Sequence, residues 1–161
     1  MLKQIFESEK ISFVEVSEDL VNDYLIMVND YENVNRFLGR SNQVYTKQDE
    51  IDWVNKKLRD HKIVYSMIEK ESGEFIGNIE FMDVDDRTKE LGIAITAKMQ
   101  DRGFGTEAIN RMINHGFDVL GLKKIVLKAN PDNDRALHVY RKCGFIEYDR
   151  NDDDVFMEIC R

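Results

Sequence analysis

The sequence predicts a domain of the mixed α/β class, and three observations support this. Apolar residues recur with a period of two in several short segments, which is the pattern of half-buried strands. Segments 63–69 and 75–84 flank Ser72 and Gly73, which indicates an antiparallel hairpin. A helix lies between the predicted strands 90–96 and 125–129, so these two strands are expected to be parallel. The length of 161 residues favours a single domain covering residues 1–161.

Two helices are predicted between the first strand, 11–16, and the hairpin. Ser17 is a typical N-cap residue, and it is followed by two acidic residues where the helix dipole favours anions. That helix weakens near residues 31–33, resumes, and ends at Gly39. Thr46 and Asp49 have the spacing of a capping box, which predicts the start of the second helix. The predicted apolar face of the second helix consists of Ile51, Val54 and Leu58.

The C-terminal half continues with a helix from about Gly105 to Gly121, a residue suited to end a helix. After the strand 125–129, either Asp132 or Asn133 caps a last helix that ends at Gly144. Two final strands, 145–148 and 155–159, are expected to complete the sheet.

Composition excludes several classes of partner. The 23 basic and 31 acidic residues give a net charge of −8, which argues against nucleic acid as a partner. Charged residues interrupt every apolar segment, so no membrane span is expected, and the N-terminus lacks a signal-peptide core. Cys143 and Cys160 form no disulfide framework, which indicates reduced thiols in a cytoplasmic protein.

The stretch 100–106 carries the main functional signal. Gly103 and Gly105 have no side chain, so backbone N–H groups can approach an anion there. The helix that follows places its positive end at the same point, and Arg102 adds a charge. A pyrophosphate-containing cofactor therefore fits this turn, although an ordinary glycine-containing helix start would have the same residues.

A nicotinamide-dependent oxidoreductase is the competing enzyme class. The segment from Gly103 to Ala108 fits the loose dinucleotide pattern G-x-G-x-x-G/A. That pattern should directly follow its strand, however, and residues 98–102 intervene here. The next strand ends at Ala129 and Asn130, without the acidic residue that would bind a ribose.

The combined motifs resemble those of the GNAT superfamily of acetyl-CoA-dependent N-acetyltransferases. Gln100, Gly103 and Gly105 match the family motif Q/R-x-x-G-x-G/A for the CoA pyrophosphate. A second motif is matched by a set of residues in the last helix and after it: Asn133, Ala136, Tyr140, Gly144 and Phe145. The run 133–145 is close to the pattern of members that acetylate ribosomal-protein N-termini, polyamines and antibiotics.

The resemblance covers residues 60–159 well and the first 60 residues only in outline. It implies a mostly antiparallel, twisted mixed sheet with a central parallel strand pair and about four helices. It also implies one N-acetyltransferase domain over residues 1–161. Dimers are frequent in the family, so a homodimer is an expectation of the same kind.

The resemblance also implies a mechanism, in which an amine attacks the acetyl-CoA thioester directly. A backbone N–H within residues 93–95 would polarise the thioester carbonyl. Tyr140 would protonate the leaving thiolate, and Glu80 and Glu90 are the candidates for the base, although a water chain often serves instead. The expected cofactor-binding residues are Ile93, Ala94, Ile95, Gln100, Asp101, Arg102, Gly103, Phe104, Gly105, Thr106, Asn133, Ala136, Tyr140 and Lys142. A non-catalytic acyl-CoA sensor on the same fold remains an alternative.

The acceptor is expected to be a cationic amine, because the chain is acidic and both candidate bases are carboxylates. An amine must lose its proton before it attacks. A peptide α-amine has a reference pKa of about 7.7–8.0 against about 10.4 for lysine, so it loses that proton more easily. A peptide N-terminus or a small polyamine-like amine therefore ranks above an internal lysine. The sequence shows no metal-ligand set and no Ser/His/Asp or Cys/His arrangement.

Overall fold

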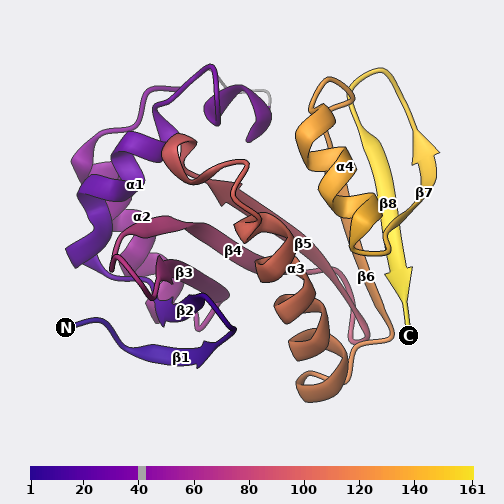
Figure 1. Ribbon diagram of the computed structural model, residues 1–161, viewed down its shortest axis with the longest axis horizontal. Helices are drawn as coiled ribbons and strands as arrows, with labels where there is room; N and C mark the ends of the chain where they lie inside the picture. Colours follow the sequence, from indigo (N-terminus) through magenta and orange to yellow (C-terminus); the bar gives the residue numbers. More distant parts are fainter. Residues whose placement is uncertain (40–42) are drawn as a thin grey trace. The chain divides into compact units, whose positions relative to one another are not determined.

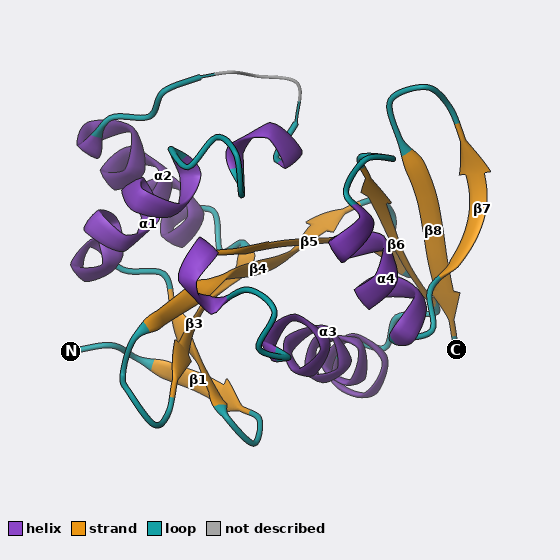
Figure 2. Ribbon diagram, turned by 45° about the horizontal axis from the view of Figure 1, so that its top comes forward, coloured by secondary structure: helices purple, strands orange, loops and turns teal. Residues whose placement is uncertain are grey.

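A computed structural model describes residues 1–39 and 43–161 of the chain. Within these described residues, eight strands form one sheet in the order β1-β2-β3-β4-β5-β6-β8-β7, and four α-helices accompany it (Figures 1 and 2). The strands are β1 (Gln4–Glu7), β2 (Ile11–Glu15), β3 (Ile63–Glu69), β4 (Phe75–Asp83), β5 (Thr88–Ile95), β6 (Lys124–Ala129), β7 (Ile146–Arg150) and β8 (Val155–Cys160). The α-helices are α1 (Val21–Val28), α2 (Lys47–Arg59), α3 (Phe104–Asn114) and α4 (Asp134–Lys142). Single helical turns are η1 (Glu18–Leu20), η2 (Asn35–Phe37), η3 (Ala97–Met99) and η4 (His115–Val119).

The chain divides into two compact units. The first unit consists of Met1–Glu80 and Ile93–Phe104, and the second of Phe81–Gly92 and Gly105–Arg161. Strands β4 and β5 each contribute residues to both units. The expectation of a single domain over residues 1–161 stays a prediction.

The first unit is built around the antiparallel pair β2 and β3, in which Ile11 lies opposite Glu69 and Glu15 opposite Tyr65. Its core is a cluster of buried apolar side chains from β2, β3, α1 and α2, in which Tyr24 is fully buried. The Tyr24 hydroxyl accepts from the backbone N–H of Ser17 and lies 2.6 Å from Ser66 Oγ. Ser66 Oγ in turn donates to Asn78 Oδ1 at 2.7 Å, so the buried hydroxyls of Tyr24 and Ser66 are both hydrogen-bonded.

The local signals in the N-terminal half are confirmed. Ser17 Oγ accepts from the backbone N–H of Asp19, and both hydrogen bonds of the Thr46 and Asp49 capping box are present. The segment after Ser17 starts as the 3₁₀ turn η1 before α1 begins. Strand β1 is an element that the sequence pattern did not predict. On the predicted apolar face of α2, Val54 is buried, whereas Leu58 near the end of the helix is 37% exposed.

The second unit contains the predicted parallel pair. Thr88, Lys89 and Glu90 of β5 lie opposite Lys124, Ile125 and Val126 of β6, which confirms the parallel arrangement. Strand β6 pairs with β8 in antiparallel fashion along its whole length, and β7 pairs with the other side of β8.

Helix α3 does not continue regularly to its end, because residues His115–Val119 form a π-helical turn. A Cβ atom at Gly116 would lie 3.1 Å from side-chain atoms of both Leu122 and Phe81, so glycine allows this turn to pack closely. Gly121 and Gly144 have φ angles of +69° and +104° and follow the helices as left-handed caps, as predicted. Within the described ranges, no helix is long and apolar enough to cross a membrane.

Candidate active site

The turn that leads from β5 into α3 has the backbone geometry of an anion-binding loop. Asp101 and Gly103 both have left-handed φ angles, +61° and +85°. Aspartate tolerates this region better than most residues, and glycine has no Cβ penalty there. Helix α3 begins at Phe104, directly after the second of these residues. The first amide groups of the helix therefore follow the loop at once, where a phosphate is stabilised by N–H groups and by the helix dipole.

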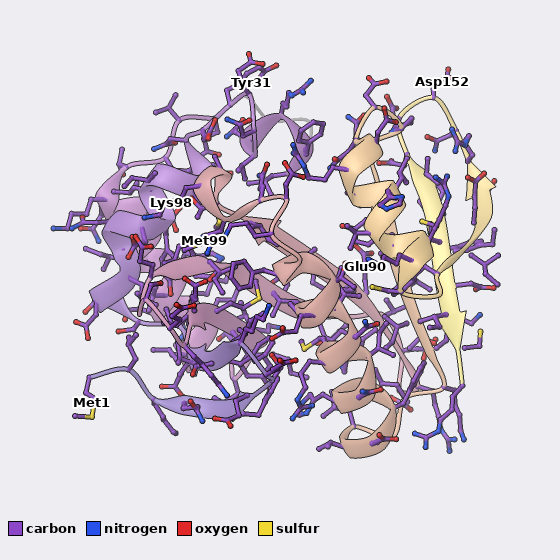
Figure 3. All side chains as sticks on the ribbon, in the orientation of Figure 1. Met1, Tyr31, Glu90, Lys98, Met99 and Asp152 are labelled. Carbon is purple, nitrogen blue, oxygen red and sulfur yellow. The ribbon has the colours of Figure 1, made fainter. Side chains whose placement is uncertain are left out.

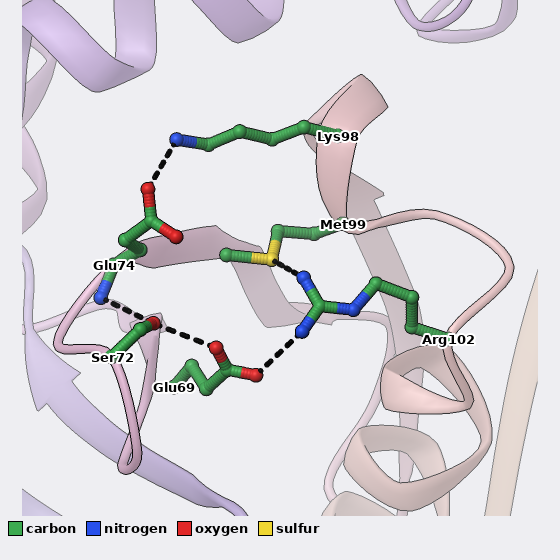
Figure 4. A network of polar contacts seen from close by, with 6 residues as sticks. All are labelled: Glu69, Ser72, Glu74, Lys98, Met99 and Arg102. Atoms are coloured by element: carbon green, nitrogen blue, oxygen red, sulfur yellow. Dashed lines mark hydrogen bonds and ion pairs between the residues drawn. The ribbon is translucent and has the colours of Figure 1, made fainter.

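Arg102 is paired within the protein. Its guanidinium Nη2 lies 2.9 Å from Glu69 Oε2, and its Nη1 lies 3.0 Å from Met99 Sδ (Figure 4). The same group lies 5.1 Å from the centre of the Phe104 ring. The buried carboxylate of Glu69 requires a charged partner, which Arg102 provides. Binding of a phosphate by Arg102 stays a prediction.

Gln100, the first residue of the pyrophosphate motif, uses its side chain inside the protein. Its Nε2 donates to the backbone oxygens of Ile95 at 2.9 Å and Asn33 at 3.2 Å. The loop is thus tied to the end of β5 and to the segment that follows α1. The amide group of Gln100 acts as a cross-link within the first unit.

The end of β5 is approached closely by β4. A Cβ atom placed on Gly77 would lie 2.0 Å from the carbonyl oxygen of Ala94 and 2.9 Å from Cα of Ile95. The residue that allows this close approach is a glycine, Gly77 of β4. Residues 93–95 are half-buried, and a side chain at position 77 would force the backbone of Ala94 and Ile95 to shift.

The two candidate bases have different surroundings. Glu80 Oε2 lies 3.1 Å from Lys57 Nζ, and both side chains are about one-quarter exposed, at 27% and 23%. The Lys57 ammonium also lies 5.8 Å from the centre of the Trp53 ring, so it is placed near an aromatic face and a carboxylate. Glu90 lies on β5 in the second unit, where it is half-buried and opposite Val126 (Figure 3). The structure therefore joins Glu80 to Lys57, while Glu90 belongs to the other unit.

Helix α4 begins as predicted. Of the two alternatives for its cap, Asn133 is correct, because its Oδ1 accepts from the backbone N–H of Ala136 at 3.2 Å. This hydrogen bond uses the Asn133 side chain locally. Ala136 is half-buried, and Lys142 is exposed at the end of the helix.

Tyr140 on α4 is only 9% exposed, and its ring lies 6.2 Å from that of Phe145. Burial, with a smaller effect of Cys143, raises the pKa of Tyr140 to about 12. Its hydroxyl therefore keeps its proton at neutral pH, and its role as a proton donor stays a prediction.

Cys143 lies one turn after Tyr140, and its Sγ is 3.8 Å from the carbonyl oxygen of Thr106. Burial raises the pKa of the Cys143 thiol, which disfavours the nucleophilic thiolate. Both cysteines are free thiols. In the described part of the chain, no three His, Cys, Asp or Glu residues are grouped as metal ligands would be.

Comparison with known families assigns the fold. Residues 10–146 match the acetyltransferase (GNAT) domain. The chain belongs to the GNAT family. A GNAT acetyltransferase from Bacillus anthracis superposes with a TM-score of 0.85 at 18% identity, covering 99% of this chain and 98% of that one. Spermidine N-acetyltransferase from Vibrio cholerae, solved with CoA and spermine, superposes with a TM-score of 0.83 at 22% identity, covering 95% and 96%. The predicted mostly antiparallel GNAT sheet with one parallel pair is therefore confirmed.

A sequence relative at higher identity is Spermidine N(1)-acetyltransferase of Vibrio cholerae, which is 32% identical over 106 residues. That match covers 64% of this chain and 61% of the relative. Against the corresponding Escherichia coli protein the chain spans about half of the relative's length, 51%. Membership of GNAT removes the main support for the nicotinamide-dependent alternative.

Sequence reasoning missed Glu69 and Lys57. Glu69 is 33 positions from Arg102, and Lys57 is 23 positions from Glu80. No local pattern marks such contacts. A glutamate directly after the apolar pair Met67 and Ile68, at the end of β3, is the one signal that could have drawn attention to Glu69.

Proposed function

We propose that the protein is an N-acetyltransferase that transfers an acetyl group directly from acetyl-CoA to a primary amine. The loop with left-handed Asp101 and Gly103, followed at once by the N-terminus of α3, supports this most strongly. Its exposed glycine and its helix amides fit a pyrophosphate. In this proposal residues 100–106 hold the diphosphate, and residues 133, 136 and 142 lie along the rest of the cofactor.

Acetyl-CoA would supply the activated acetyl group, and the chain would orient it and manage the protons. Among the described residues, parallel pairing to β6 runs from Thr88 to Glu90, so residues 93–95 lie outside that ladder. This supports the assignment of their backbone to the pantetheine arm and the thioester carbonyl. Tyr140, which stays protonated, would donate its proton to the departing sulfur.

The acceptor in this proposal is a small polyamine-like amine or a peptide N-terminus. The net charge of −8 favours a cationic acceptor, and the named relatives from Vibrio cholerae and Escherichia coli are spermidine acetyltransferases. The proposal retains a homodimer and a cytoplasmic location, where free thiols such as Cys143 and Cys160 stay reduced. A non-catalytic acyl-CoA sensor is the second candidate, because the Glu80 carboxylate is already paired.

Binding of CoA tests the proposal first. A ligand that binds only the native state raises the unfolding temperature, so CoA should do so and NAD at the same concentration should not. Gly103→Glu should abolish the shift, because a carboxylate would lie against the diphosphate and a non-glycine residue is strained at this φ. Acetyl-CoA turnover with spermidine and with peptides of varied N-terminus then separates an enzyme from a sensor. A thermal shift with NAD alone would contradict the proposal, and CoA binding without thiol release for any amine would favour the sensor.

Lys57 offers a test of the Glu80 assignment. Lys57→Met should raise kcat/KM for spermidine by about two- to five-fold, since a partly exposed ion pair that competes with the acceptor is removed. Glu80→Gln should lower the same constant. Lys124→Met is the matched control, because it removes an equal charge from a pair with Glu158 in the second unit. Unchanged constants in both Lys57→Met and Glu80→Gln would exclude Glu80 from acceptor recognition.

A further inference from the structure

The carboxylate of Glu69 is a buried charge outside the residues assigned so far. Glu69 ends β3, is 7% exposed, and lies opposite Ile11 of β2. Its backbone is held in the hairpin, because its N–H donates to the Glu74 carbonyl and its carbonyl accepts from Gly73. A carboxylate at such a site is costly unless it is paired and hydrogen-bonded. The side chain therefore has a defined position and needs strong partners.

Each oxygen of this carboxylate has its own donor. Glu69 Oε1 accepts from Ser72 Oγ at 2.6 Å, and Oε2 accepts from Arg102 Nη2 at 2.9 Å (Figure 4). Ser72 Oγ also accepts from the backbone N–H of Glu74 at 3.1 Å. The hairpin turn thus orients the carboxylate, and the carboxylate orients the arginine.

Arg102 connects the Glu69 carboxylate to the loop formed by residues 99–104. It stands between the left-handed residues Asp101 and Gly103, and its guanidinium also contacts Met99 Sδ and faces the Phe104 ring. Met99 is almost completely buried, so one end of the loop is anchored in the core. Backbone conformations of this kind persist when surrounding contacts determine them. Arg102 supplies such contacts on both sides of Gly103.

We propose that Glu69 is a positioning residue for the diphosphate-binding loop and acts through Arg102. It takes up the charge of Arg102 and fixes residues 99–104, so that the amides after Gly103 point to the anion. This inference rests on the proposed binding of acetyl-CoA. It assigns recognition of the diphosphate to backbone amides and the helix end, with Arg102 as a support of the loop. In the opposite arrangement, Arg102 leaves Glu69 to bind the phosphate. Glu69→Gln would then free Arg102 and tighten the binding of CoA.

The test compares CoA with pantetheine, which ends before the diphosphate, by titration calorimetry on the full chain. Glu69→Gln should weaken CoA binding by about ten-fold, the effect of losing one charged hydrogen bond. The affinity for pantetheine should stay within about two-fold, since the loop contacts only the diphosphate end in this proposal. Arg102→Lys keeps the charge that Glu69 needs but cannot contact Glu69 and Met99 at the same time. This variant should therefore fold and lose affinity for CoA but not for pantetheine. The double variant Glu69→Gln with Arg102→Lys should bind CoA only slightly more weakly than either single variant, because both substitutions remove the same interaction.

Glu74→Gln is the matched control on the same hairpin. Glu74 pairs with Lys98 at 2.7 Å, and both side chains are at least half exposed, so CoA affinity should not change. Tighter or unchanged CoA binding in Glu69→Gln and Arg102→Lys would overturn the inference. An equal loss for CoA and pantetheine would also overturn it, because it would show a general structural role. Failure of the wild-type chain to bind CoA would instead contradict the proposed function and, with it, this inference.

Discussion

Gly77→Ala should remove most of the affinity for CoA while leaving a folded protein. The added Cβ atom would lie 2.0 Å from the backbone oxygen of Ala94, and backbone cannot rotate away as a flexible side chain can. Strand β5 must therefore shift at the residues assigned to the pantetheine arm. Overpacking of this kind costs about 1–3 kcal/mol of stability. A displacement of the binding strand should raise the dissociation constant of CoA by at least about ten-fold, a loss of 1.4 kcal/mol.

The measurement for this variant is the dissociation constant of CoA at a temperature well below its unfolding midpoint. Gly116→Ala is the control, since the atoms nearest to its Cβ would be side-chain atoms of Leu122, Phe81 and Ile125, at 3.1–3.2 Å. It should lower the unfolding temperature with little effect on CoA. If Gly77→Ala binds CoA as the wild type does, residues 93–95 do not hold the cofactor.

Tyr140→Phe should lower kcat on the order of 10²-fold with little change in CoA affinity, because it removes only the proposed proton donor. Burial holds the pKa of Tyr140 at about 12, above its ordinary value near 10. The hydroxyl is therefore protonated throughout an assay from pH 6 to 9. The ratio of wild-type to variant rates should accordingly be constant over that range, and any alkaline loss of activity should come from another group.

Pre-steady-state turnover at several pH values checks this prediction under conditions where the chemical step limits the rate. Tyr148→Phe serves as the control, since Tyr148 is exposed on β7. An unchanged chemical rate in Tyr140→Phe would remove the hydroxyl from the mechanism. A loss that shrinks steadily as pH rises would show that Tyr140 ionises within the assay range, because the wild type would then lose its proton donor.

The features predicted correctly from the sequence depend on residues close together in the chain. The Thr46 and Asp49 capping box, the Asn133 cap and the left-handed Gly121 and Gly144 are each set within one helical turn. The parallel β5 and β6 pair follows from a single intervening helix, which leaves only one direction for the return strand. The π-helical turn and strand β1 escaped prediction, because packing against residues distant in the chain decides them.

The sequence by itself determined the family and the position of the turn for which anion binding is proposed. Both follow from short motifs, residues 100–105 and 133–145. These motifs can be recognised locally because they consist of glycines with unusual backbone conformations and of residues at helix ends. Tertiary structure alone decided what the charged side chains do. Arg102 meets Glu69 and Glu80 meets Lys57 because β3, β4, α2 and the loop come together in one unit. The physical reason is that a buried or half-buried charge must find its partner in space, and sequence separation places no limit on where that partner lies.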